Sequence, residues 1–505
     1  MIGINAIERE FQFQSYVYVP TDADQSSIDL AIARQIKSAT GALNIFKVSL
    51  NNSDSLIKIK INDLEREIMT VFDPNDQSDG GRKIQKISYR YRDNVVASSD
   101  LKDSITLEVT LLANDYTPYA DELIRECTDG ISADLETIWY YYRPQMSSCK
   151  EKIIREIAEI AKAQQDIKKG TKVVSSFETI RWFIPVTVSL GPEQRPNHKV
   201  YPEYDRLFGI DNSKSQLIVY AFGGVDLDAY LPDDRFAQEY FSFLRQMLKD
   251  SPKFRISYTR PDSDPLDISV DGQKIKDLTY ASLFTWILDQ KDYPPELGND
   301  PDKILKLRSQ VMTKFAEHWI YWEQSAKIGS VNAKGEKLTK EMTIQIRSFF
   351  GNDYLGLKAM QGAKARYAEA FSYGDIILYN GHAQFGKGAM DPLLYSSENF
   401  NDRYQLMFFN SCYSFSYYHQ QFFNLKPGGK NNLDMIINGL PSKIKKSGQV
   451  TANLLNGILN LKDYESILLA MHRSSCCEFD ELRVVDGELD NLFSPLITPL
   501  NIALE

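Results

Sequence analysis

The chain is poor in cysteine. Only five cysteines occur in 505 residues, namely Cys127, Cys149, Cys412, Cys476 and Cys477. Small secreted domains held together by disulfides carry a far higher density, so that class of protein is excluded. The odd number leaves at least one thiol unpaired within the chain. Cys127 and Cys149 are able to pair in an oxidising compartment.

Long apolar runs are also absent. No stretch reaches the roughly 18 apolar residues that a membrane-spanning helix needs. The segment from Met1 to Gln14 lacks the apolar centre of a secretory signal. The chain as written is therefore expected to be soluble and cytoplasmic, whereas a precursor trimmed before Met1 would make it periplasmic or secreted.

An excess of basic charge is lacking as well. The 58 lysines and arginines are outnumbered by 68 aspartates and glutamates, which leaves a net charge of −10. This balance disfavours a broad surface for nucleic acid or for an anionic membrane. Hydrophobic residues at 43% and charged residues at 25% are ordinary for a globular protein, so extended disorder and fibrous folds are excluded.

Alternating apolar and polar residues mark the first part of the chain. The alternation is clearest in segments 87–92 and 105–111. One apolar face and one wet face are typical of an antiparallel sheet. We therefore predict a β-rich, sandwich-like N-terminal domain over residues 1–145, with a helix near 26–38, and then a linking helix over 146–170.

Strands and helices interleave beyond residue 170. The apolar run from Leu217 to Phe222 predicts a strand buried on both faces. The pattern predicts an α/β domain over 171–505, with a mostly parallel sheet covered by helices on both faces and a helical insertion at about 275–330. Later strands are predicted at 342–349, 375–380, 404–410 and 433–438, and helices at 355–371, 414–424 and 449–460.

Two of these predicted strands end in reactive side chains. The strand at 375–380 is followed by Gly381 and His382, and the strand at 404–410 by Ser411 and Cys412. The carboxyl ends of parallel strands gather at one edge of a sheet. A thiol becomes nucleophilic as a thiolate, which a nearby imidazole and the positive end of a following helix both favour.

This pair of strand ends resembles the caspase–gingipain superfamily (clan CD) of cysteine peptidases. The similarity covers about residues 340–470. It implies a caspase-like sheet, His382 as general base and acid, Cys412 as nucleophile, a protein or peptide substrate, and no cofactor or metal. It also implies that the His382 ring and the Cys412 sulfur face each other. The sequence departs from the family at Ala383, where glycine is usual, and it lacks the caspase Gln-Ala-Cys-x-Gly signature.

The rest of the predicted site surrounds these two residues. The backbone amides of Ala383 and Cys412 are predicted to form the oxyanion hole. Tyr413 is predicted to line a substrate groove. Asn438 and Gly439 lie at the end of the next strand, whose trailing loop helps to build the substrate pocket in the family that the chain resembles.

Three other interpretations stay open. A caspase-type fold without activity would be an interaction scaffold. Residues 381–387 fit the Gly-x-x-x-x-Gly-Lys of a nucleotide-hydrolysing P-loop, although Gly388 replaces the Ser or Thr that holds magnesium. His472, Cys476 and Cys477 provide three metal-binding side chains, one fewer than a structural zinc site uses.

Overall fold

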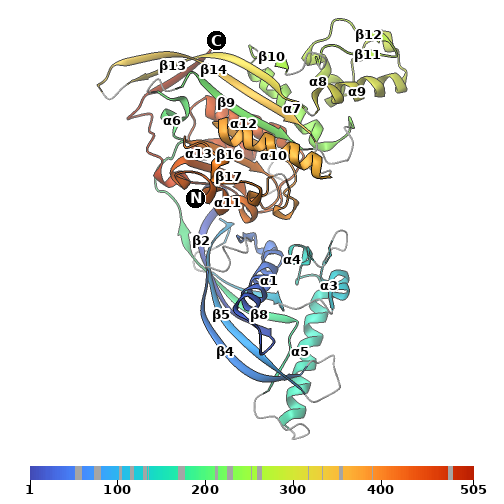
Figure 1. Ribbon diagram of the computed structural model, residues 1–505, viewed down its shortest axis with the longest axis vertical. Coiled ribbons are helices and arrows are strands. Elements are labelled where there is room, and N and C mark those ends of the chain that lie inside the picture. Colours follow the sequence, from blue (N-terminus) through green and yellow to red (C-terminus); the bar gives the residue numbers. More distant parts are fainter. Residues whose placement is uncertain are drawn as a thin grey trace. The chain divides into compact units, whose positions relative to one another are not determined.

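The computed structural model describes residues 1–51, 60–72, 81–101, 105–113, 119–128, 133–134, 136–168, 177–210, 214–224, 231–251, 253–258, 264–316, 318–331, 334–351, 356–388, 390–475 and 481–505. The chain forms two compact units (Figure 1). The N-terminal unit is Ile7–Gln194, and the C-terminal unit combines Met1–Ala6 with Arg195–Glu505. Among the described residues, no helix has the length and apolar character needed to cross a membrane.

The N-terminal unit is built on one seven-stranded sheet, with the strand order β6-β8-β2-β5-β4-β7 and with β3 beside β5. The long strands β4 and β5 form the curved ribbon that Figure 1 shows in blue. The strands are β2 (Ala6–Val19), β3 (Val48–Ser49), β4 (Ile61–Phe72), β5 (Arg82–Ser98), β6 (Thr106–Leu112), β7 (Phe177–Thr179) and β8 (Phe183–Gln194).

Helix α1 (Gln25–Leu43) covers one face of this sheet. Asp24 begins the helix by accepting a hydrogen bond from the Ser27 amide at 2.8 Å. Ile32 of the helix and Tyr89 of β5 belong to the same buried cluster. The apolar face of the sheet therefore packs against a helix, and the described residues contain no second sheet in this unit, so the predicted sandwich is not confirmed.

The boundary between the units lies at residue 194, not between the predicted domains 1–145 and 171–505. Strand β8 is antiparallel to both β2 and β6, so it completes the N-terminal sheet. Helix α5 (Ser147–Lys168) also belongs to this unit, because its Glu156 accepts hydrogen bonds from the amides of Trp182 and Phe183. The predicted linking helix is thus a packed part of the N-terminal unit.

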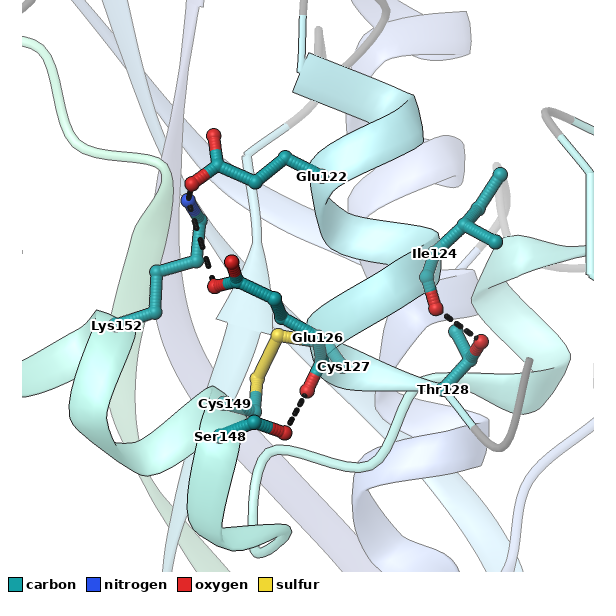
Figure 2. Close-up of a disulfide and its surroundings, with 8 residues drawn as sticks. All are labelled: Glu122, Ile124, Glu126, Cys127, Thr128, Ser148, Cys149 and Lys152. Atoms are coloured by element: carbon teal, nitrogen blue, oxygen red, sulfur yellow. Dashed lines mark hydrogen bonds and ion pairs between the residues drawn. A yellow bond between two sulfur atoms is a disulfide. The ribbon is translucent and has the colours of Figure 1, made fainter.

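A disulfide joins two helices of the N-terminal unit (Figure 2). Cys127, the last residue of α3 (Ala120–Cys127), is bonded to Cys149 in the first turn of α5. Both side chains are fully buried. Beside the disulfide, Lys152 of α5 pairs with Glu122 and Glu126 of α3, so an ion-pair group joins the same two helices.

The C-terminal unit is built on a ten-stranded mixed sheet, in the order β1-β18-β17-β16-β15-β9-β14-β13-β10 with β19 beside β13. Strands β17, β16, β15, β9 and β14 are parallel, and the strands at both sides of this centre are antiparallel. The strands are β1 (Ile2–Gly3), β9 (Gln216–Gly223), β10 (Arg255–Tyr258), β13 (Ile320–Val331), β14 (Lys337–Phe350), β15 (Ile376–Asn380), β16 (Gln405–Asn410), β17 (Leu433–Asn438), β18 (Arg483–Asp486) and β19 (Leu500–Leu504).

Helices cover both faces of this sheet. Leu378 and Phe408 share a core cluster with residues of α7 and α12. The next residues along the strands, Tyr379 and Phe409, point to the opposite face and contact rings of α10 and α11. The helices are α7 (Arg235–Asp250), α10 (Gly356–Tyr373), α11 (Ser414–Leu425), α12 (Ser447–Leu459) and α13 (Tyr464–Ser474).

The prediction of an α/β unit with a parallel centre is confirmed. The strand predicted at 433–438 is β17, and the other strands and helices predicted after residue 342 are present within a few residues. The predicted insertion at 275–330 contains α8 (Tyr280–Leu288) and α9 (Pro301–Phe315), but the chain returns to the sheet at Ile320 as β13. The antiparallel flanks were not predicted, so "mostly parallel" is too strong.

We expect the double variant Cys127→Ala/Cys149→Ala to lose stability. The disulfide closes a loop with a sequence separation of 22 residues. Such a crosslink restricts the unfolded chain and contributes about 3 kcal/mol. Urea unfolding of the oxidised protein, the reduced protein and the double variant measures this effect. If all three unfold at the same urea concentration, the disulfide does not stabilise the unit.

Candidate active site

The structure brings His382 and Cys412 to the same edge of the C-terminal sheet. Strands β15 and β16 are parallel neighbours, and their register pairs Asn380 with Asn410. His382 and Cys412 each follow two residues after these paired asparagines. Loops that leave adjacent parallel strands at the same level lie side by side. The expected juxtaposition of the two loops is therefore present.

Three asparagines end three neighbouring parallel strands and bond to one another; we call them the asparagine row (Asn380, Asn410 and Asn438). The side-chain amide of Asn410 donates to Asn380 at 2.8 Å, and that of Asn438 donates to Asn410 at 3.1 Å. Asn380 in turn donates to the hydroxyl of Thr451 on α12 at 2.7 Å. Hydrogen bonds in such buried surroundings are strengthened by the low local dielectric.

A buried ion pair completes the asparagine row. Arg483 donates to Asn438 at 2.9 Å and to Asn410 at 3.1 Å, and it pairs with Glu481. Burial lowers the pKa of Arg483, whereas the charge of Glu481 acts in the opposite direction. Glu481 also accepts a hydrogen bond from the backbone amide of Lys443 at 3.0 Å. The network thus extends from the strand ends to the loop between β17 and α12.

Cys412 lies in a sharp turn between β16 and α11. The next residue, Tyr413, has φ +50° and ψ 35°, and this left-handed conformation costs a bulky residue roughly 1–2 kcal/mol. Its amide donates to the carbonyl of Leu440 at 3.2 Å, which fixes the turn against the β17–α12 loop. Cys412 therefore directly precedes the positive end of a 12-residue helix, where a thiolate is favoured.

The His382 loop is attached to the helix that follows Cys412. The hydroxyl of Tyr418, on α11, donates to the carbonyl of Ala383 at 2.9 Å. The hydroxyl of Tyr379, at the end of β15, donates to the carbonyl of His382 at 2.8 Å. These two hydroxyl groups hold the carbonyl groups of two successive residues, His382 and Ala383. The backbone of the His382 loop is thus attached to α11.

Unfavourable backbone conformations gather in the same loop. Gln384 and Phe385 have φ values of 49° and 55°. Gly386 has φ +79°, and a Cβ there would lie 2.9 Å from the Tyr417 ring, so only glycine fits. Together with Tyr413, these residues concentrate strained backbone around the two candidate side chains. Such strain occurs preferentially at functional sites.

The partners of the two candidate side chains lie on α7 and on the β17–α12 loop. The His382 ring packs edge-to-face on Phe236 in the first turn of α7, with ring centroids 4.7 Å apart. The Cys412 sulfur donates to the carbonyl of Ser442 at 3.7 Å, in the β17–α12 loop. Glu239, one turn after Phe236, accepts hydrogen bonds from two backbone amides at the end of that loop. Helix α7 and this loop therefore adjoin each other beside the two candidates.

The surroundings of Cys412 raise the pKa of its thiol, and the sulfur has a hydrogen-bond partner. Burial raises its pKa, and the negative charge of Glu481 raises it further, whereas hydrogen bonds with Ser442 act in the opposite direction. The hydrogen bond of the sulfur goes to Ser442 and not to the His382 ring. The hydrogen bond of the sulfur is thus used by the β17–α12 loop, and the predicted facing of ring and sulfur stays a prediction.

The predicted pocket residues are buried and do not line an open groove. Tyr413 is 2% exposed and Asn438 is fully buried. Gly439 donates its amide to the carbonyl of Leu482 at 3.1 Å, as an extension of the sheet. The predicted oxyanion-hole residues, Ala383 and Cys412, lie on the two adjoining loops. The polar groups of Tyr413, Asn438 and Gly439 are therefore used within the structure: Asn438 bonds in the asparagine row, and the amides of Tyr413 and Gly439 bond to backbone carbonyls.

The sequence contained a signal for the asparagine row that our prediction missed. Each of three consecutive apolar strands ends in asparagine, at positions 380, 410 and 438. A repeated amide at equivalent strand ends predicts side-by-side hydrogen bonding. Arg483 carries no comparable signal, because its strand is antiparallel to β17 and it lies 45 residues after Asn438. Glu481 precedes this strand and carries none either.

The phosphate-binding and zinc interpretations find no support in the described residues. The turns after Gly381 are short 3₁₀ segments, Gln384–Gly386 and Pro392–Leu394, instead of an α-helix whose N-terminus would hold phosphate. No group of three or more metal-binding side chains occurs in the described part of the chain. Cys476 and Cys477 lie outside that part, so the proposed ligand set with His472 is not described.

We expect Glu481→Gln to destabilise the protein by about 3–5 kcal/mol, because it leaves the buried Arg483 charge without its partner. Urea unfolding measures the change. The matched control is Glu465→Gln on the exposed side of α13, which should change stability by less than about 0.5 kcal/mol. Equal effects of the two substitutions would contradict the role of the ion pair.

We also expect iodoacetamide to label Cys412 more slowly in the folded protein than in the urea-unfolded chain. Since burial raises the pKa of the folded thiol, a smaller fraction is thiolate at any given pH below it. The folded protein should therefore reach its highest labelling rate at a higher pH than the unfolded chain. Mass spectrometry of the Cys412 peptide separates this thiol from the others. Faster labelling in the folded state would contradict the raised pKa.

Comparison with known proteins provides no further guide to this site. No protein-family model matches the chain. No curated protein and no solved structure matches it either. The support for a function therefore comes from the residues and geometry described above.

Proposed function

We propose that this protein is a cysteine endopeptidase of the caspase–gingipain type, with Cys412 as nucleophile and His382 as general base and acid. The observation that carries this proposal is the parallel pairing of β15 and β16, since it sets the two loops side by side at equal distances from Asn380 and Asn410. The helix that begins after Cys412 and the strained backbone of both loops add support.

The proposed reaction has two stages. His382 takes the thiol proton, the Cys412 sulfur bonds to the peptide carbonyl carbon, and the carbon–nitrogen bond breaks as His382 returns the proton to the leaving amine. Water, activated by His382, then hydrolyses the thioester and restores the thiol. The amides of Ala383 and Cys412 are proposed to stabilise the oxyanion in both stages.

The proposal requires the site to rearrange before it reacts. The thiol donates to the Ser442 carbonyl, and the His382 ring packs on Phe236. A peptide that binds along the β17–α12 loop would displace the contact between Cys412 and Ser442 and free the sulfur for His382. This structure is then the resting form of the enzyme.

One specific observation favours a second function, that of an interaction scaffold without catalysis. The raised pKa of Cys412 and its hydrogen bond to Ser442 describe a partly buried thiol whose reactivity is lowered. A scaffold would keep this arrangement when a peptide binds. The two functions therefore differ in whether peptide bonds are cleaved and whether Cys412 is needed.

Cleavage of a degenerate peptide library, read by mass spectrometry, tests the proposal. The wild-type protein should cleave library peptides. Cys412→Ala and His382→Ala should each reduce the rate by at least about 100-fold, because Cys412 forms the covalent bond and His382 transfers the proton in the transition state. The matched control is His198→Ala, an exposed histidine of the same unit, which should keep full activity.

Two results would contradict the peptidase. Cleavage that is unchanged in Cys412→Ala would have another origin, and so Cys412 would not be the nucleophile. Failure of the folded wild-type protein to cleave any library peptide between about pH 5 and 8, where histidine changes charge, would favour the scaffold.

A further inference from the structure

A polar pocket of about 540 Å³ opens on the seven-stranded sheet of the N-terminal unit. Three neighbouring strands, β8, β2 and β5, supply its side chains. Its volume is within the range of about 300–1,000 Å³ that small-molecule sites occupy. The lining residues are Gln12, Phe13, Gln14, Arg90, Arg92, Pro185, Val186, Thr187 and Ser189.

The alternation of β5 places two arginines in this pocket. Tyr89 and Tyr91 are buried on the face that α1 covers. Arg90 and Arg92 therefore lie on the other face, because successive side chains of a strand point in opposite directions. On the neighbouring strand, the register pairs Gln12 of β2 with Ser189 of β8, so these polar side chains are cross-strand neighbours.

The lining carries two positive charges and no carboxylate. The charge of Arg90 is partly neutralised by Asp63, whose carboxylate oxygen lies 3.1 Å from the Arg90 guanidinium. The same guanidinium donates to the side-chain oxygen of Gln14. Arg92 is exposed, and among the described residues its guanidinium has no hydrogen-bond or ion-pair partner. Like charges on one face of a strand repel each other. An anion between Arg90 and Arg92 would remove this repulsion.

Neutral polar side chains line the pocket together with Arg92. The amide of Gln12 and the hydroxyl of Ser189 line the same pocket. Thr187 also lines it, and its hydroxyl donates to Glu108 at 2.9 Å. A guanidinium together with amide and hydroxyl donors matches a ligand with several negatively charged oxygen atoms.

We propose that this pocket binds a small organic oxyanion, either a polycarboxylate or a phosphate ester, with Arg92 as its main charged contact. The planar fork of the guanidinium binds two oxygen atoms at once. Asp63 and Glu108, which bond to lining residues, would repel a long acidic polymer that extends past the pocket. The ligand is therefore a small molecule. This site is independent of the peptidase proposal, since its residues belong to the other unit.

Isothermal titration calorimetry on the full chain tests this site. The probes are citrate and, separately, inorganic phosphate, with chloride holding the ionic strength constant. We expect saturable binding of at least one probe. Arg92→Gln should weaken it at least about tenfold, and Arg92→Lys should give an intermediate loss because it keeps the charge but not the fork. The probe that binds more tightly identifies the carboxylate or the phosphate class.

The matched control is Arg66→Gln, which removes an exposed arginine of β4 outside this pocket. It should leave the affinity unchanged, and circular dichroism should show all variants folded. Absence of saturable heat with both probes would overturn the proposal. Unchanged binding in Arg92→Gln, or equal weakening in Arg66→Gln, would overturn it as well, because the anion would then bind elsewhere or through general charge.

Discussion

The candidate active site depends on the buried positive charge of Arg483, which needs a counter-charge and hydrogen-bond acceptors. Arg483 lies within the C-terminal sheet, and its guanidinium bonds to Glu481, Asn410 and Asn438. An unpaired charge at this depth would cost several kcal/mol. The asparagine row therefore has two roles. It provides hydrogen-bond acceptors for the guanidinium, and it holds the ends of β15, β16 and β17 in register. The loops with His382 and Cys412 begin at these aligned strand ends.

The same network couples the site to a loop that controls the thiol. Glu481 accepts a hydrogen bond from the amide of Lys443, next to the Ser442 carbonyl that accepts a hydrogen bond from the Cys412 thiol. Glu239 of α7 holds the other end of this loop, and Phe236 of the same helix packs on the His382 ring. Helix α7 thus contacts His382, the β17–α12 loop contacts Cys412, and Glu239 joins this helix to this loop. In the proposed peptidase, a change in the loop would alter the thiol directly and would reach the imidazole through Glu239 and α7.

Local sequence patterns predicted much of the fold. They could not predict which strands pair when these strands are far apart in the sequence. The apolar run at 433–438 predicts β17, because a strand buried on both faces needs no polar positions. The pairing of β1 with β18 joins residues Ile2 and Val485, and no local pattern predicts such a contact. The unit boundary was misplaced for the same reason, since β8 completes a sheet that begins at Ala6. His382 and Cys412 were identifiable from their strand ends, whereas the bond of the thiol to Ser442 depends on how a later loop folds back.

The central claim is that Cys412 and His382 act together once a peptide opens the site. The most direct measurement is the rate at which a peptidyl chloromethyl ketone modifies Cys412, followed by mass spectrometry in the wild-type protein and in His382→Ala. We expect this reagent to modify the folded wild-type protein faster than iodoacetamide does, because its peptide part displaces the Ser442 contact. We expect His382→Ala to remove that advantage. Equal rates for the two reagents, unchanged by His382→Ala, would contradict the account.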